Sequence, residues 1–66
     1  MRITVNGQDR YVASSLTVTT LLETLGINPK TAVVERNLKI VDRGNFSSEA
    51  LEDGDQIEII RLVGGG

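Results

Sequence analysis

The chain ends in Leu62-Val63-Gly64-Gly65-Gly66, and this segment presents the most distinctive reactive group in the sequence. Ordering a glycine costs more conformational entropy than ordering any other residue, and glycine adds no side chain to a core. The terminal carboxylate of Gly66 would stand on a thin arm of roughly 10 Å, at about 3.3–3.6 Å per extended residue. We expect the side-chain-free Gly64 and Gly65 to thread a narrow channel into a partner's active site. The alternative is a frayed terminus without a function.

Other chemical groups are scarce. The chain has no cysteine and no histidine, so it lacks a disulfide framework, a thiol nucleophile and the commonest general base. The acidic segment Glu52-Asp53-Gly54-Asp55 lacks the alternating ligands and terminal glutamate of a calcium loop, and we interpret it as a solvated turn. We therefore expect no catalytic residue, no metal site and no cofactor on this chain.

Composition limits the classes of partner. With 66 residues the chain forms one small domain with little margin of stability, predicted over 1–63 with 64–66 as a flexible tail. Seven basic and nine acidic residues are interspersed without a basic run, and Tyr11 and Phe46 are the only aromatics, which argues against nucleic acid binding. A mildly acidic surface suits a partner with a basic face. No stretch is long enough to span a membrane, the sequence begins without a signal-like segment, and we expect a cytoplasmic protein.

The first elements form a predicted hairpin. Arg2–Val5 alternates polar and apolar residues, which is typical of a half-buried strand. Asn6-Gly7 follows and is the strongest short signal for a type I′ turn, because both residues tolerate positive φ. We assign it a purely architectural role. The return strand is predicted over Gln8–Ala13.

A single helix follows the hairpin. Its apolar residues recur at the spacing of one helical face, with Thr17 as the predicted N-cap, Gly26 as the stop and Leu16 packing onto the first turn. The apolar residues are Val18, Leu21, Leu22 and Leu25. A stripe of this kind can bind a partner helix, but here it is needed to cover the sheet.

Three further strands are predicted. Ala32–Val34 runs into a turn at Asn37, and Leu38–Val41 is a short strand after it. Residues 42–45 are predicted to form a loop, Phe46 to fill the core beneath it, and residues 47–51 to form one helical turn. The last strand is predicted over Gln56–Val63.

The order of these elements predicts a topology. A right-handed crossover through the helix places the final strand parallel to the first, in the middle of a mixed sheet with the helix across one face. This α+β arrangement is the β-grasp, or ubiquitin-like, fold. Ile57 and Ile59 point to one face of the last strand, whereas Ile60 and Leu62 point to the other. Two roles are open for Ile60, Leu62 and Val63: they form a patch for docking a partner beside the tail, or they belong to the core.

The motifs in their order resemble those of a known family. They are Val5-Asn6-Gly7, the helix from Thr17-Val18 to Leu25-Gly26, Val33-Val34-Glu35-Arg36-Asn37, Ile40-Val41 with Arg43, Leu51-Glu52-Asp53-Gly54-Asp55, and Ile57-Glu58-Ile59 through Val63-Gly64-Gly65-Gly66. Over essentially its whole length the chain resembles the ThiS family, the small sulfur carrier proteins of thiamine biosynthesis. Asp42 stands where that family often has proline, and Lys39 where it often has glycine.

The resemblance implies a mechanism and a set of partners. An ATP- and magnesium-using enzyme similar to ThiF would adenylate the carboxylate of Gly66, and a sulfurtransferase or cysteine desulfurase would supply sulfur to form a thiocarboxylate. Thiazole synthase, a ThiG-like enzyme, would then take that sulfur. Gly64 and Gly65 would thread the active sites of these partners. The chain itself would be a carrier protein and not an enzyme.

Three alternatives remain open at this point. A carrier for molybdopterin or another pathway shares the same glycine end. A ubiquitin-like modifier would join Gly66 to a lysine. A plain binding module would leave the glycines without a role.

Overall fold

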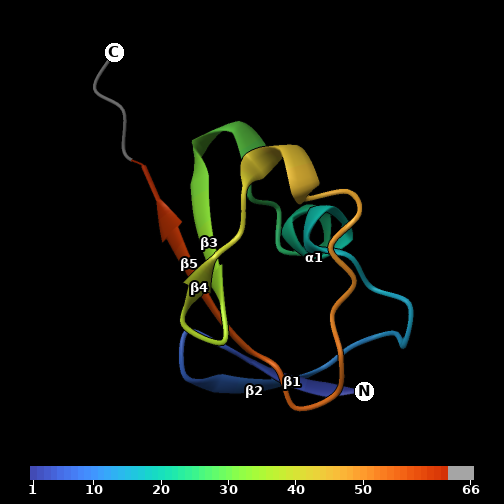
Figure 1. The fold of residues 1–66 in the computed structure, drawn as a ribbon. Helices are drawn as coiled ribbons and strands as arrows, with labels where there is room; N and C mark the ends of the chain where they lie inside the picture. The colour runs from blue at the N-terminus through green and yellow to red at the C-terminus, as the bar shows by residue number, and fades with distance from the viewer. Residues whose placement is uncertain (63–66) are drawn as a thin grey trace.

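The computed structural model describes residues 1–62, which form eight short elements (Figure 1). In chain order these are β1 (Arg2–Val5), β2 (Gln8–Tyr11), α1 (Val18–Thr24), the 3₁₀ helix η1 (Pro29–Thr31), β3 (Ala32–Arg36), β4 (Lys39–Ile40), the 3₁₀ helix η2 (Arg43–Asn45) and β5 (Gln56–Arg61).

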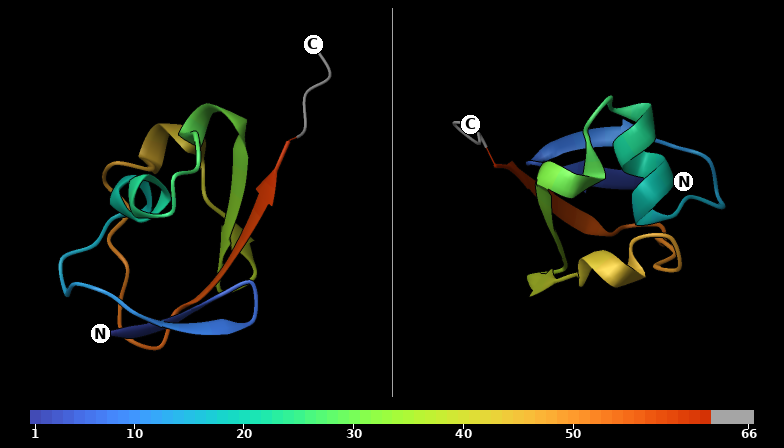
Figure 2. Two further views of the ribbon diagram at one scale, coloured as in Figure 1. Left: turned by 180° about the vertical axis from the view of Figure 1, so that it is seen from behind. Right: turned by 90° about the horizontal axis from the view of Figure 1, so that it is seen from above.

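The five strands form one mixed sheet in the order β2-β1-β5-β3-β4. β5 is the central strand, pairing in parallel with β1 and antiparallel with β3. α1 packs across one face of the sheet, as Figures 1 and 2 show from three directions. The predicted α+β, β-grasp topology is confirmed, including the parallel position of the last strand beside the first.

The core lies between α1 and the sheet. Val18, Leu21 and Leu22 of the helix are buried, and Leu16 ahead of it is buried as well. The other core residues are Ile3, Val5, Ala32, Val34, Val41, Phe46, Leu51, Ile57 and Ile59. In a domain this small, each of these side chains is a large part of the area removed from water.

Local signals explain where α1 begins and ends. Thr17 is the N-cap, and its hydroxyl accepts a hydrogen bond from the Thr20 N–H while the Thr20 hydroxyl accepts one from the Thr17 N–H. This reciprocal pair satisfies two of the helix's free donors. Gly26 adopts a φ of +71° just past the C-terminus, a left-handed conformation that glycine takes without a Cβ penalty.

Several predicted boundaries were wrong. β2 ends at Tyr11 and not at Ala13, and β5 ends at Arg61, with Leu62 beyond it and Val63 outside the described residues. The helical turn predicted over 47–51 is absent from that segment, and η2 forms at Arg43–Asn45 instead, where a loop was predicted. Within residues 1–62, no helix has the length and apolar character that crossing a membrane requires.

Candidate functional site

β5 leads directly to the glycine segment and is the best anchored strand of the sheet. Its backbone is hydrogen-bonded on both sides, to β1 and to β3. Past the end of the strand, the Leu62 N–H donates to the Thr31 carbonyl at 2.7 Å. The chain is therefore held by tertiary contacts as far as the residue that precedes 63–66.

Two asparagines from the hairpin turns fix the position of β5. The Asn6 side chain accepts a hydrogen bond from the Ile59 N–H at 2.8 Å and donates to the Ile59 carbonyl at 3.3 Å. On the other side, the side-chain oxygen Oδ1 of Asn37 accepts a hydrogen bond from the Gln56 N–H at 2.9 Å. Both asparagines have positive φ, +51° and +52°, which asparagine tolerates better than most residues. The role of Asn6 thus extends beyond the turn itself, because its side chain continues the hydrogen bonding between β1 and β5.

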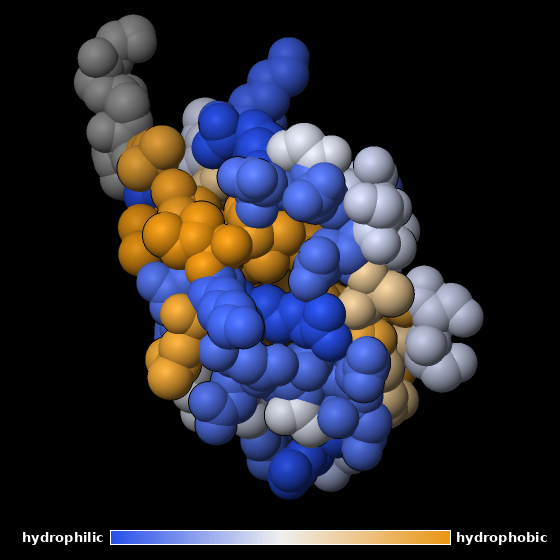
Figure 3. Space-filling view, in the orientation of Figure 1, coloured by the Kyte–Doolittle hydropathy of each residue, from blue (hydrophilic) through white to orange (hydrophobic). Residues whose placement is uncertain are grey.

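From Gln56 to Ile60, the side chains of β5 alternate between the open face and the core. Ile57 and Ile59 are buried against the helix side, whereas Ile60 and Leu62 are 54% and 52% exposed on the other side. Ile40 of β4 is also exposed. Figure 3 shows hydrophobic residues gathered over β3, β4 and β5 on the left of the molecule. Exposed apolar residues that gather in this way are typical of a protein-docking surface.

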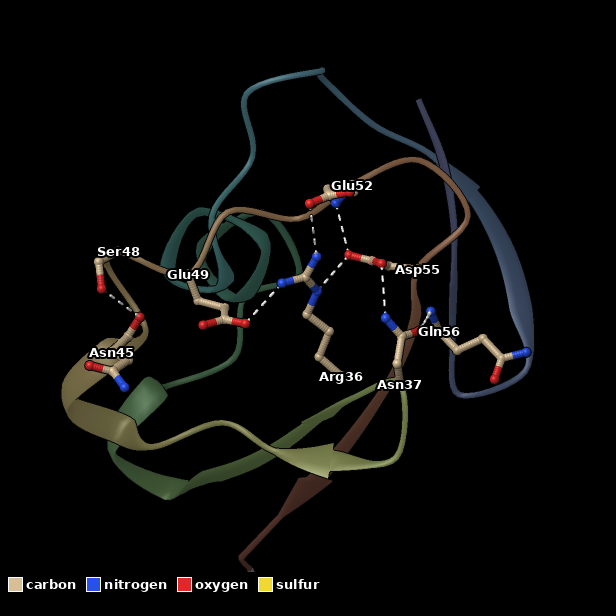
Figure 4. A network of polar contacts seen from close by, with 8 residues as sticks. All are labelled: Arg36, Asn37, Asn45, Ser48, Glu49, Glu52, Asp55 and Gln56. Atoms are coloured by element: carbon tan, nitrogen blue, oxygen red, sulfur yellow. Dashed lines mark hydrogen bonds and ion pairs between the residues drawn. The ribbon is translucent and has the colours of Figure 1, made fainter.

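A polar network closes the end of the sheet at which β5 begins (Figure 4). The Asp55 carboxylate accepts hydrogen bonds from Arg36 Nε at 2.7 Å, from Asn37 Nδ2 at 3.0 Å and from the Glu52 N–H at 2.8 Å. Arg36 also pairs with Glu49 at 2.9 Å and with Glu52 at 3.6 Å. Asp55 is only 6% exposed, so the expectation of a solvated turn was wrong for this residue. Its carboxylate connects the turn at residues 52–55 to β3 and to the turn that follows β3.

The charge state of Asp55 follows from two opposing effects. Burial by itself would raise the pKa of the carboxyl, but the hydrogen bonds from the Glu52 N–H, Asn37 and Arg36 outweigh it and hold the pKa below its usual value. The pKa of Arg36 is raised by its hydrogen bonds to Asp55 and then Glu49. Both groups are ionised near neutral pH, and the network is a structural ion pair.

The predicted site residues fall into two groups. Ile60 and Leu62 lie at the surface, so the alternative that they belong to the core is wrong, and their role in docking stays a prediction. Val63 and Gly64, Gly65 and Gly66 lie outside the described residues. In the part of the chain that the structure describes, no group of three or more His, Cys, Asp or Glu side chains could hold a metal ion.

Sequence reasoning missed the partners of Asp55. The distances in sequence between Asp55 and Arg36 or Asn37 are too long for a local pattern to reveal. It also missed Leu38, whose φ is +71° and which is 85% exposed in the turn between β3 and β4. The only signal available was the preceding Asn37, which marks a turn but does not say how many residues it contains.

Comparison with known proteins gives consistent matches over all or nearly all of the chain. The model of the ThiS family matches residues 3–66. The sulfur carrier protein ThiS of Escherichia coli is 35% identical over 66 residues, covering 100% of both chains. The ThiS of Bacillus subtilis is 35% identical over 63 residues, covering 94% of this chain and 96% of that protein.

The chain also matches a solved structure and part of a longer enzyme. The crystal structure of a thiamine biosynthesis protein (ThiS) from Geobacter metallireducens superposes with a TM-score of 0.86 at 38% identity, covering 100% of both chains. A thiazole synthase of Paramagnetospirillum magneticum is 41% identical over all 66 residues. The chain spans 20% of the length of that enzyme.

Proposed function

Because this chain belongs to the ThiS family, we propose that it is a sulfur carrier of thiamine biosynthesis whose working group is the carboxylate of Gly66. The observation that carries the proposal is the family match, which extends through Gly66 and so includes the glycine segment. It is supported by the overall similarity to sulfur carrier proteins named ThiS at full length.

The proposed chemistry starts from an unreactive group. A carboxylate is a poor acyl donor, because neither oxygen is a good leaving group. Attack of a Gly66 oxygen on the α-phosphorus of ATP forms an acyl-adenylate and releases pyrophosphate. The outer sulfur of a persulfide on a sulfurtransferase or cysteine desulfurase then attacks the acyl carbon and displaces AMP, which gives an acyl disulfide. A thiol cleaves the S–S bond of this acyl disulfide, is itself oxidised to a disulfide with the donor cysteine, and leaves the second sulfur on the acyl group. The product is a thiocarboxylate on Gly66, which donates its sulfur to thiazole synthase.

In this proposal the catalytic groups, ATP and magnesium belong to the partners. The carrier contributes position alone, which in well-oriented reactions is worth up to about 7–11 kcal/mol. A body without histidine or cysteine suits this division of work, because no side chain competes with Gly66 for the activated sulfur. The anchoring of β5 by Asn6 and Asn37 supports a fixed starting point for the segment that Gly64 and Gly65 belong to.

Three partners follow from the proposal. They are a ThiF-like adenylating enzyme, the sulfur donor, and thiazole synthase. The match between this chain and part of a thiazole synthase supports the last of these, since a carrier-like region and the enzyme occur there in one protein. We propose that partners dock on the exposed side of β5, where Ile60 and Leu62, with Val63, adjoin the glycine segment.

Mass spectrometry tests the proposal directly. The protein is co-expressed with the adenylating enzyme and a sulfur source, and its intact mass is measured before and after treatment with an alkylating agent. We expect the increment for one oxygen replaced by sulfur, localised to Gly66 and sensitive to alkylation. The control is a variant lacking Gly65 and Gly66, which should show no increment. A wild-type protein that never acquires sulfur under these conditions refutes the proposal.

Two further readouts distinguish the alternatives. Rescue of a thiazole auxotroph, and not of a molybdopterin mutant, identifies the pathway. Reductant-resistant conjugates of higher mass on a denaturing gel would instead identify a protein modifier.

A further inference from the structure

A hollow of about 290 Å³ lies on the open face of the sheet, between the two hairpin turns. Its lining comprises Thr4, Gly7, Leu38, Gln56 and Glu58. Thr4 pairs with Gln56 across β1 and β5, while the next pair, Val5 and Ile57, is buried on the helix side. The hollow therefore opens away from α1, on the same face as Ile60 and Leu62.

Leu38 lines this hollow and has an unfavourable backbone conformation. Asn37 and Leu38 form the two-residue turn between β3 and β4, and both have positive φ, as in a type I′ turn. The second position of such a turn normally holds glycine, because a Cβ is strained there. Leu38 nevertheless stands there with a φ of +71°, 85% exposed and outside the core. Strain that the fold does not need is most often found at functional sites.

Glu58 adds a second unfavourable feature on the same face. It lies directly opposite Glu35 in the antiparallel pair of β3 and β5, and like charges in that position repel. Neither glutamate forms an ion pair with another residue in the range 1–62. By contrast, Arg2 on the same sheet is paired with Asp9 at 3.7 Å. The two carboxylates leave a concentration of negative charge beside the hollow.

We propose that the hollow receives a lysine or arginine side chain from the surface of thiazole synthase. The inference rests on the proposed function. The methylene groups of such a side chain would pack against Leu38, and its charged end would lie between Glu58 and Glu35. Ile40 lies opposite Glu35 on β4 and Ile60 opposite Val33 on β5, so apolar surface borders the charges. Because apolar side chains surround the two carboxylates, this surface suits the cationic side chain of a protein better than a free small cation.

The position of the hollow fits a single interface that also includes the end of the sheet. Glu58 precedes Leu62 by four residues, about 13 Å along an extended strand at about 3.3 Å per residue. A standard interface covers about 800 Å² on each partner, which is wide enough to include both. One partner surface can therefore bind the hollow and Leu62 while the segment beyond enters its active site.

The test measures binding and stability together. The probe is thiazole synthase from the same organism, titrated with wild-type carrier and with Leu38→Asn, Glu58→Gln and the control Glu23→Gln, an exposed glutamate on α1. We expect Leu38→Asn and Glu58→Gln each to raise Kd about tenfold, while the control stays within about twofold. We expect the melting temperature to stay level or rise, by about 4 °C for Leu38→Asn, since both changes remove an unfavourable feature.

Salt dependence provides an independent readout. The wild-type Kd should increase as NaCl rises from about 50 to about 300 mM, and Glu58→Gln should flatten this dependence. Unchanged binding in either variant, or a wild-type Kd that ignores salt, overturns the inference. Absence of binding to the synthase overturns it too. The intact-mass experiment on wild-type protein does not depend on these binding measurements. If the binding tests fail but Gly66 still acquires a thiocarboxylate, this inference is wrong and the proposed function stands.

Discussion

Replacing Asp55 with alanine removes the group on which the polar network converges. The carboxylate accepts three hydrogen bonds at 2.7–3.0 Å, and the bond from Arg36 joins two charged groups. Bonds of the charged type contribute about 1.5–3 kcal/mol each. The loss also leaves the mostly buried guanidinium of Arg36 with Glu49 and the exposed Glu52 as its remaining partners. We expect the free energy of unfolding to fall by about 2–4 kcal/mol.

This loss is a large part of the total free energy of unfolding. At about 0.05–0.15 kcal/mol per residue, a chain of this length has roughly 3–10 kcal/mol of stability. The assay is urea unfolding followed by far-ultraviolet circular dichroism at neutral pH, because the protein has no tryptophan. The melting temperature should fall by about 8 °C or more, at about 4–8 °C per kcal/mol for a domain of this size. A loss below about 1 kcal/mol for Asp55→Ala would refute the role given to the network, and Glu23→Gln is the matched surface control.

The pH dependence gives the same prediction a second measurement. The pKa of Asp55 in the folded protein lies below its ordinary value of 3.8, so the carboxylate stabilises the fold fully above that value. The stabilisation is lost as pH falls through the lower folded pKa. The difference in stability between wild type and Asp55→Ala should therefore stay constant from about pH 7 to pH 5 and shrink below about pH 4.

Two other substitutions distinguish a residue of the proposed docking surface, Leu62, from a residue that stabilises the sheet, Asn6. Leu62→Asp should change stability by no more than about 0.5 kcal/mol, because the side chain is half exposed, yet weaken partner binding at least about tenfold; isothermal titration beside a melting curve measures both. Asn6→Ala should destabilise by about 1–3 kcal/mol in urea unfolding, since it removes two hydrogen bonds to Ile59 and places alanine at positive φ. Asn6→Gly loses the same hydrogen bonds but tolerates positive φ, so it should destabilise the protein less than Asn6→Ala. Equal losses of stability in the two variants would show that the positive φ of Asn6 carries no cost for alanine.

Local signals in the sequence were sufficient for the fold. The Asn6-Gly7 turn, the Thr17 cap and the alternation of β1 each depend on residues close together in the chain, and each was confirmed. Together with the handedness of the crossover, they determine the strand order. Boundaries failed where local preference was weak, as in 42–51, where burial of Phe46 and Leu51 and hydrogen bonds to α1 and Leu16 decide the path.

The features around the candidate site were less accessible to sequence reasoning. The pairing of Asp55 with Arg36 joins residues 19 apart, and an isolated acidic turn is more commonly solvated. The exposure of Ile60 and Leu62 was one of two alternatives, because in a small domain every large apolar residue is a candidate for the core. Only the three-dimensional register shows that the helix covers the opposite face.

The alternation of β5 links stability to recognition. Because side chains on a strand switch faces at every residue, a shift of one residue would bury Glu58 and Ile60 and expose Ile57 and Ile59. Asn6 holds Ile59, Asn37 holds Gln56, and Asp55 holds both Arg36 and Asn37, so the strand is fixed from both neighbours and from its start. The same contacts that stabilise the sheet therefore determine which residues form the proposed docking surface. If that surface binds a partner, a variant that loosens these contacts should weaken binding even though it changes no residue of the surface.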